Sequence, residues 1–254
     1  MLEAQGSAEA LRVFCRAQGI NEVYVSVSER NQMMAESSMT RMIAVLHSAN
    51  IRVEALLSSE NADEGGKHLE KLLDRVRTIV QFNRSHSREQ FDGIHLDIEP
   101  QQRPENKGPG NLRFLPGLVE AYRQVRALAE PAGLTVNADI QNKLLKGNLD
   151  ERRMLLSALP RLTLMMYELS SPDDGASIDT KRQKVRDSSQ KFLEMAYEGL
   201  ADGRLAKMVI GLRIPDYEQL MPMMLQTLDE ANHGDAHYLG WAWHSYNDSS
   251  QAPQ

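Results

Sequence analysis

The chain has 254 residues, of which 41% are hydrophobic, 25% charged and 6% aromatic. This ordinary globular composition excludes a disordered or fibrous protein. Lys and Arg number 29 and Asp and Glu number 35, and the resulting net charge of −6 argues against nucleic acid or an anionic membrane as the main partner. The single cysteine, Cys15, excludes an intramolecular disulfide.

Two further classes are disfavoured by the pattern of apolar residues. No apolar run is long enough to span a bilayer, so we expect no membrane partner. Residues Met1–Ala10 lack the basic segment followed by an apolar one that marks a signal peptide.

Short β-branched segments alternate with longer amphipathic ones along the chain. The first helix is expected at Ala8–Gln18, ended by Gly19. The remaining expected elements are, in chain order, strand Val23–Val27, helix Met39–Ala49, strand Ile51–Leu57, helix Lys67–Phe82, strand Phe91–Glu99, a helix around Leu115–Val125, strand Leu134–Ile140, helix Glu151–Leu159, strand Leu162–Tyr167, helix Lys181–Leu200, strand Met208–Ile214, helix Tyr217–Ala231 and strand Tyr238–Trp243. Pro222 is expected to kink the last helix or delay its start. Lys181, Arg182, Lys184 and Arg186 are expected on a solvated helix face.

Strict alternation of strands and helices implies a parallel sheet with helical crossovers. We predict an α/β fold, a TIM-type (β/α)8 barrel in which seven strands are visible and the first strand and last helix are missing. Residues 1–246 would form a single barrel domain, with a polar tail over 247–254. An open barrel edge would favour self-association there. An open doubly wound sheet is the alternative, although no strand is followed by G-x-G-x-x-G.

Reactive groups in parallel barrels lie at the carboxyl ends of the strands, and side chains alternate along each strand. His95, Asp97 and Glu99 therefore share one face of their strand, opposite three apolar residues. Three ionisable groups on an inward face are costly unless they are hydrogen-bonded or functional. Similar inward polar positions are Tyr24, Glu54, Asn137 with Asp139, and Tyr167. This face predicts a substrate cavity, or else a structural hydrogen-bonded network.

These residues also carry a family resemblance. Segment Phe91–Glu99 resembles the D-G-x-D-x-D-x-E strand of the chitinase-like glycoside hydrolases of family 18. Met165–Glu168 resembles that family's M-x-Y-D motif, and Tyr238–Trp243 resembles its last strand, which carries a Trp. The chain is also similar to bacterial barrel proteins that carry the sequence H-L-D-I-E-P, here His95–Pro100, and that are described as glycosidase-like. The resemblance implies a hydrolase of carbohydrate metabolism that needs no cofactor and no metal.

The resemblance also implies roles for single residues. Glu99 matches the general acid that protonates the glycosidic oxygen, and Asp97 matches the carboxylate that orients the substrate acetamido group. Tyr167 matches the hydroxyl that hydrogen-bonds the reacting sugar. The further candidate substrate-binding residues are His95, Asp139, Glu168, Trp243 and Glu54.

Three positions depart from the family pattern. His95 stands where the family has its middle Asp, and Glu168 stands where the family has Asp. On the last strand, alternation puts His244 at the position expected for the Trp on the floor of the site, and a shift by one residue restores Trp243.

Three functions remain open at this stage. The first is acid-catalysed hydrolysis of a glycosidic bond in a poly- or oligosaccharide, with Glu99 as proton donor and Asp97 as its partner. The second is a metal-dependent sugar isomerase or hydrolase, in which His95, Glu54, Asp139 and the same two carboxylates bind a divalent cation. The third is a non-catalytic, lectin-like barrel that binds carbohydrate.

Overall fold

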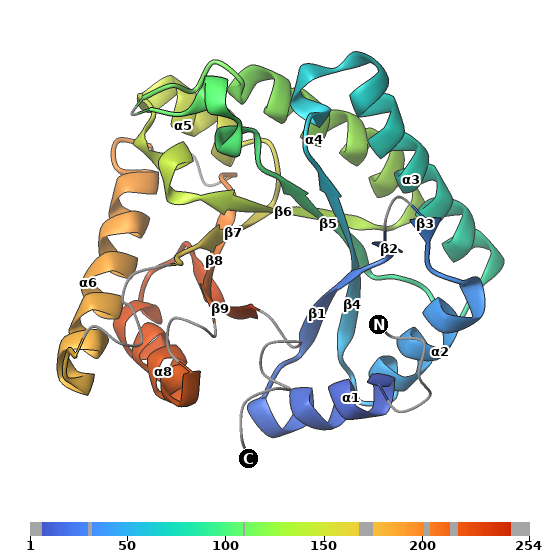
Figure 1. Ribbon diagram of the computed structural model, residues 1–254, viewed down its shortest axis with the longest axis horizontal. Helices are drawn as coiled ribbons and strands as arrows, with labels where there is room; N and C mark the ends of the chain where they lie inside the picture. The colour runs from blue at the N-terminus through green and yellow to red at the C-terminus, as the bar shows by residue number, and fades with distance from the viewer. Residues whose placement is uncertain are drawn as a thin grey trace. The chain divides into compact units, whose positions relative to one another are not determined.

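The computed structural model describes residues 7–29, 32–108, 110–167, 175–200, 204–213 and 218–244. Its main sheet has seven strands in the order β1-β4-β5-β6-β7-β8-β9, so the order in the sheet follows the order in the chain (Figure 1). The strands are β1 Glu22–Ser26, β4 Arg52–Ser59, β5 Gly93–Ile98, β6 Thr135–Gln141, β7 Arg161–Met165, β8 Lys207–Arg213 and β9 Tyr238–His244.

The pairings described within the main sheet are all parallel. Helices alternate with these strands, and 3-10 turns join several of them. The helices are α1 Ser7–Gln18, α2 Glu36–His47, α3 Gly66–Ser85, α4 Leu115–Ala129, α5 Leu149–Leu156, α6 Ile178–Tyr197 and α8 Met221–Asn232. The 3-10 turns are η1 Ala62–Glu64, η2 Pro100–Gln102, η3 Pro104–Asn106, η4 Glu130–Ala132, η5 Asn142–Lys146 and η6 Glu218–Leu220. This order confirms the predicted α/β fold of TIM type with seven strands.

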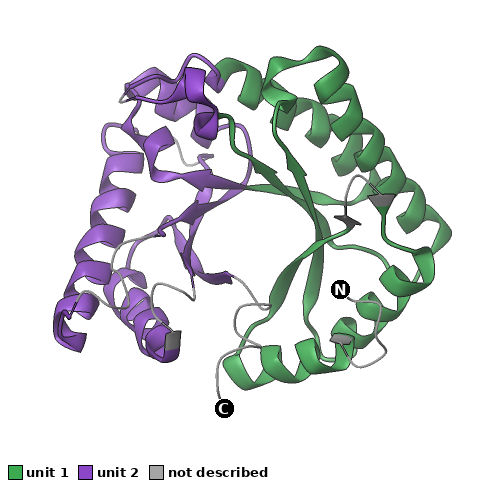
Figure 2. Cartoon of the chain, viewed as in Figure 1, with its two compact units in different colours: residues 1–100, 116–138 green, residues 101–115, 139–254 purple. Residues whose placement is uncertain are grey.

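The chain divides into two compact units, one of residues 1–100 and 116–138 and the other of residues 101–115 and 139–254 (Figure 2). The prediction of a single domain over residues 1–246 stays a prediction, and the predicted tail over 247–254 lies outside the described residues.

In the first unit, α1 to α4 lie along one side of β1, β4 and β5 (Figure 2). Helix α3 turns the expected apolar stripe toward the core, with Leu72 and Val76 fully buried. Helix α1 ends before Gly19, whose φ of 69° is the left-handed conformation that favours glycine at a helix end. Near the end of α3, the buried Asn83 side chain donates to the Phe91 carbonyl and accepts from the Phe91 N–H, which fixes the approach to β5.

In the second unit, α5 begins with a capping box in which the side chains of Asn148 and Glu151 each bond the other residue's backbone N–H. Helix α8 starts at Met221 with Pro222 in its first turn, which confirms the predicted late start. The expectation that Lys181 lies on a solvated face is wrong. Lys181 is 6% exposed and lies on the face of α6 that also buries Val185 and Ser189, where Asn232 of α8 donates to Ser189 Oγ. Lys184 of the same helix is exposed, as expected.

Strands β2 Ser28–Glu29 and β3 Gln32–Met33 form a short antiparallel pair that the sequence pattern did not predict.

Within the described residues, no helix is both long and apolar enough to cross a membrane.

Candidate functional site

The carboxyl half of β5 carries the polar face on which the candidate site is built. Ile94, Leu96 and Ile98 are at most 1% exposed, as the alternation predicts for the apolar face. On the other face, His95 is fully buried, whereas Asp97 and Glu99 are half-buried. Burial therefore decreases along this face toward the end of the strand, where Glu99 directly follows the last strand residue.

Glu54, from the neighbouring strand β4, is the centre of the buried part of this face. Its side chain is fully buried, and its Oε1 accepts hydrogen bonds from Asn137 Nδ2 at 2.7 Å and from Thr135 Oγ1 at 3.3 Å. Its Oε2 lies 3.3 Å from His95 Nδ1. These contacts join β4, β5 and β6 through one carboxylate.

The aromatic ring of Tyr24 from β1 covers His95. The two ring centroids are 3.7 Å apart, and the planes differ by 15°. Tyr24 lies opposite Glu54 in the pairing of β1 with β4, so one residue pair holds His95 from the side and from its ring face. The orientation of the imidazole is thereby fixed by contacts from two neighbouring strands.

Asp97 is held by the same neighbouring strand, β4. Ser58 lies opposite Asp97 in the pairing of β4 with β5, and its hydroxyl donates to Asp97 Oδ2 at 3.1 Å. Arg75 on α3 donates to the Ser58 carbonyl oxygen at 2.7 Å. Burial lowers the pKa of the Arg75 guanidinium from its ordinary value. The helix layer thus fixes the strand end that orients Asp97.

A second polar group lies at the carboxyl ends of the strands of the second unit. Tyr167 follows β7 and stacks against the ring of His244 at the end of β9, with centroids 5.3 Å apart. The Arg213 guanidinium at the end of β8 lies 5.8 Å from the centre of the Tyr167 ring. Arg213 and His244 are opposite each other in the pairing of β8 with β9. Tyr167 is therefore in contact with two basic residues.

The last strand is shifted by an irregularity in its pairing. Met208 pairs with Tyr238 but Val209 pairs with Gly240, so β9 holds one extra residue at this point. Gly240 has a φ of 132°, which other residues rarely adopt. Beyond this point, Trp243 pairs with the buried Leu212 and is half-buried, whereas His244 is the residue that stacks on Tyr167.

Two candidate substrate-binding residues remain, Asp139 and Glu168. Asp139 is half-buried on β6, in the part of that strand that belongs to the second unit. Glu168 lies outside the described residues. The assignments of Glu99, Asp97 and Tyr167 as catalytic residues, and of the other candidates as substrate-binding residues, stay predictions.

The donor set proposed for a metal is not assembled among the described residues. They include no group of three or more His, Cys, Asp or Glu side chains arranged to hold a metal ion. The buried part of the face instead pairs one carboxylate with one imidazole and two neutral donors.

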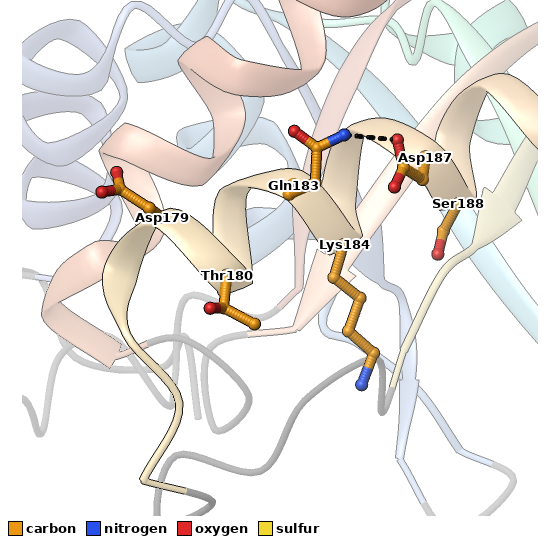
Figure 3. Close-up of a pocket in the computed structure, with 6 residues that line it drawn as sticks. All are labelled: Asp179, Thr180, Gln183, Lys184, Asp187 and Ser188. Atoms are coloured by element: carbon orange, nitrogen blue, oxygen red, sulfur yellow. Dashed lines mark hydrogen bonds between the residues drawn. The ribbon is translucent and has the colours of Figure 1, made fainter.

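A shallow depression on α6 is a different kind of surface. It is lined by Asp179, Thr180, Gln183, Lys184, Asp187 and Ser188, all from this helix (Figure 3). Gln183 Nε2 donates to Asp187 Oδ1 at 2.7 Å. Lining residues from one helix alone make a solvated helix face, and we assign no function to it.

The sequence pattern did not single out two neighbours of the candidate residues. Ser58 contacts Asp97, and Thr135 contacts Glu54. The same alternation that selected Glu54 could have selected Ser58, because Ser58 lies four positions after it on β4. Thr135 is two residues before Asn137 and shares its face in the same way.

The fold is similar to that of family 18 chitinases of known structure. A GH18 chitinase from Pseudoalteromonas aurantia is 12% identical, with a TM-score of 0.57 over 92% of this chain and 90% of that one. A class V chitinase from Pseudomonas fluorescens is 14% identical, with a TM-score of 0.53 over 81% of this chain and 65% of the other.

This chain is shorter than some of these relatives. It spans 56% of the length of catalytic domain 2 of the group II chitinase from Ostrinia furnacalis, which is 16% identical over 76% of this chain with a TM-score of 0.45. No protein-family model and no curated protein matches the sequence. What the comparisons establish is a chitinase-like, TIM-type fold.

Proposed function

We propose that this protein is a glycoside hydrolase that cleaves a glycosidic bond in a poly- or oligosaccharide, with Glu99 as proton donor and Asp97 as its partner. The observation that carries the proposal is the polar face of β5, on which two half-buried carboxylates follow a buried, hydrogen-bonded histidine. The chitinase-like fold and the D-G-x-x-x-D-x-E spacing of the same strand support it.

The proposed reaction requires proton donation from one carboxyl group and a fixed orientation of the other. Glu99 has to deliver a proton to the oxygen of the leaving group, and its position directly after β5 leaves its side chain half-buried rather than sealed in the core. Asp97 has to hold a fixed orientation, and the Ser58 hydroxyl supplies that constraint at 3.1 Å. In this scheme, Asp97 accepts a hydrogen bond from the acetamido N–H of the sugar, and the acetamido oxygen attacks the anomeric carbon.

Tyr167 is the candidate in the second unit that would hydrogen-bond the reacting sugar. Its stacking on His244 and its proximity to Arg213 fix the direction of the phenol ring. The proposed substrate is a carbohydrate, with N-acetylated sugars preferred if the acetamido group is the nucleophile.

The proposal is tested with a panel of chromogenic glycosides, with and without N-acetyl groups, on the wild-type chain and on Glu99→Gln. We expect wild-type hydrolysis of at least one glycoside and a loss of about 10²–10⁴-fold in Glu99→Gln, which is the usual contribution of a general acid. The matched control is Glu105→Gln, since Glu105 is an exposed carboxylate in the following segment, paired with Arg103. The control should keep wild-type activity.

Three results would contradict the proposal. Full activity in Glu99→Gln would remove the acid assignment. Binding of a chito-oligosaccharide by the wild type without any turnover would favour the lectin-like alternative. Loss of activity with EDTA and recovery with a divalent ion would favour the metal enzyme.

A further inference from the structure

The buried Glu54–His95 pair has no counterpart in the D-G-x-D-x-D-x-E pattern, which has a carboxylate at the position of His95. Both side chains are fully buried, and Glu54 Oε2 lies 3.3 Å from His95 Nδ1. Replacing an acidic group by a basic one at this position reverses the charge directly below Asp97. The chemical consequence depends on which protons the pair carries.

The contacts of Glu54 favour its ionised form. Asn137 Nδ2 and Thr135 Oγ1 both donate to Oε1, and an ionised carboxylate accepts hydrogen bonds at both oxygens. Hydrogen bonds to the charged form stabilise it against burial. A buried negative charge nevertheless needs a compensating positive one, since an unpaired buried ion is very costly. Of these three partners of Glu54, His95 alone can carry a positive charge.

The contacts of His95 favour its protonated form. Its Nδ1 faces the Glu54 carboxylate, and its ring is stacked on the face of Tyr24 at 3.7 Å. The face of an aromatic ring attracts a cation, most strongly where water is excluded. Among the described residues, Glu54 from β4 and Tyr24 from β1 are titratable groups in contact with His95, and Asp97 is the next residue on the same face of β5. On β6, the neutral Asn137 lies opposite His95.

Asp97 is the next residue on the same face of β5, two positions after His95. Glu54 lies opposite Gly93 and Ser58 lies opposite Asp97, so β4 brings a partner to each end of this face. Residues two positions apart on a strand lie about 6–7 Å apart, a distance at which charges in a partly buried site interact. A positive charge on His95 would therefore favour the ionised form of Asp97.

We infer that Glu54 and His95 form a buried ion pair in which His95, as an imidazolium, keeps the Asp97 carboxylate ionised. Glu54 and His95 are then positioning residues, and their role in catalysis rests on the proposed function. An ionised Asp97 accepts hydrogen bonds only, so it would select a substrate that presents an N–H or O–H at this point. In this chain a cation at position 95 favours the ionised form of Asp97, whereas the family pattern has a second carboxylate at that position.

The inference is tested by nuclear magnetic resonance on the whole chain, independently of any hydrolysis. The ring nitrogens of the seven histidines are followed against pH, and His95 is assigned by the loss of its signals in His95→Gln. In the wild type, both nitrogens of His95 should remain protonated above pH 7. In Glu54→Gln, the amide keeps the shape but loses the charge, so the titration midpoint of His95 should fall by about 1–3 pH units.

The carboxyl carbon of Asp97, assigned with Asp97→Asn, reports the second half of the inference. Its titration midpoint should rise in Glu54→Gln, because a neutral His95 no longer favours the carboxylate. The matched control is Glu36→Gln, which removes an exposed carboxylate 3.1 Å from Nε2 of His86, where solvent weakens the interaction. Neither His95 nor Asp97 should respond to that control.

The inference is overturned if His95 is neutral at pH 6 in the wild type, a result that needs no variant to fold. It is equally overturned if the Asp97 midpoint is the same in Glu54→Gln as in the wild type. A chain that shows the ion pair but hydrolyses no glycoside would contradict the proposed function and leave the pair in place, so the two failures are distinguishable.

Discussion

Gly93 lies directly opposite Glu54 in the pairing of β5 with β4, and the Glu54 carboxylate occupies the space that a side chain at position 93 would take. A Cβ atom added at Gly93 would lie 2.8 Å from Glu54 Oε1 and 2.9 Å from the Thr135 carbonyl oxygen. The absence of a side chain on the middle strand lets a carboxylate from one neighbour reach hydroxyl and amide donors on the other. Gly93 is therefore a requirement of the buried network, for reasons of space.

The first prediction follows from this close approach. Gly93→Ala should lower the free energy of unfolding by about 1–3 kcal/mol, the usual cost of overpacking a core. Urea unfolding measures the change. Gly234→Ala is the matched control, because an added Cβ there meets no heavy atom within 4 Å, and its effect should stay within about 0.5 kcal/mol. Equal effects of the two substitutions would show that the Glu54 carboxylate moves aside at no cost.

The second prediction concerns the connection from α3 to β5. Asn83→Ala removes the side chain that bonds both backbone groups of Phe91, at 2.8 and 2.9 Å. Two buried backbone groups would lose their partner at about 1–3 kcal/mol each, so we expect a loss of about 2–6 kcal/mol in the free energy of unfolding. Gln81→Ala, at an exposed position on the same helix, should change it by less than about 0.5 kcal/mol. A loss below 1 kcal/mol in Asn83→Ala would mean that water replaces the side chain.

The third prediction concerns Cys15, which is 1% exposed on α1. Burial raises the pKa of its thiol from 9.0 to about 11. The folded chain should therefore react slowly with a thiol reagent at pH 8, and the chain unfolded in urea should react at the rate of a free cysteine. Equal rates in the two states would show that α1 opens freely.

The same pKa shift makes a pH prediction with a definite sign. The folded state holds the Cys15 proton up to about pH 11, whereas the unfolded state releases it near pH 9. The contribution of this thiol to stability is complete below pH 9 and is lost as the pH rises toward 11. Unfolding curves of the wild type and of Cys15→Ala between pH 8 and 11 measure it, and the variant should lack this part of the slope. Parallel slopes in both proteins would contradict the prediction.

The fourth prediction separates the two carboxylates of the candidate site. If the acetamido group of the sugar is the nucleophile, Asp97→Asn should lower kcat on N-acetylated glycosides by about 10²-fold or more, because the amide cannot stabilise the positively charged intermediate. Ser58→Ala, which removes only the 3.1 Å hydrogen bond to Asp97, should have a smaller effect in the same direction. Steady-state kinetics on matched glycosides measure both. A smaller loss in Asp97→Asn than in Ser58→Ala would indicate that another carboxylate attacks.

The two-residue period of strands and the longer period of helices were sufficient to predict the order of elements. The predicted strands at Val23, Ile51 and Phe91 begin within two residues of the observed β1, β4 and β5. The same period placed His95 opposite Ile94 and Leu96, because side chains must alternate on any strand. Local rules also sufficed where one residue decides the conformation, as at Gly19 and Pro222.

Only the tertiary structure decided which residues on that face meet. Alternation gives the side of the sheet but not the register, and the register is set by contacts between segments far apart in the chain. It is the pairing of β4 with β5 that puts Glu54 beside Gly93 and Ser58 beside Asp97. The burial of Lys181 was likewise unpredictable from α6 alone, since Lys181 lies on the helix face whose Ser189 contacts Asn232 of α8.

The extra residue in β9 is a feature that only the structure could locate. Alternation along the sequence put His244 at the position in question, and a shift by one residue would have put Trp243 there. The irregular pairing lies between Met208 and Val209, before Gly240, and the strand alternates from Gly240 onward, so that His244 stacks on Tyr167 and Trp243 lies opposite Leu212. The place of the bulge decides the face of every residue beyond it, and the pairing with β8 sets that place. The sequence therefore determined the elements and their polar faces, and long-range pairing determined which side chains form the site.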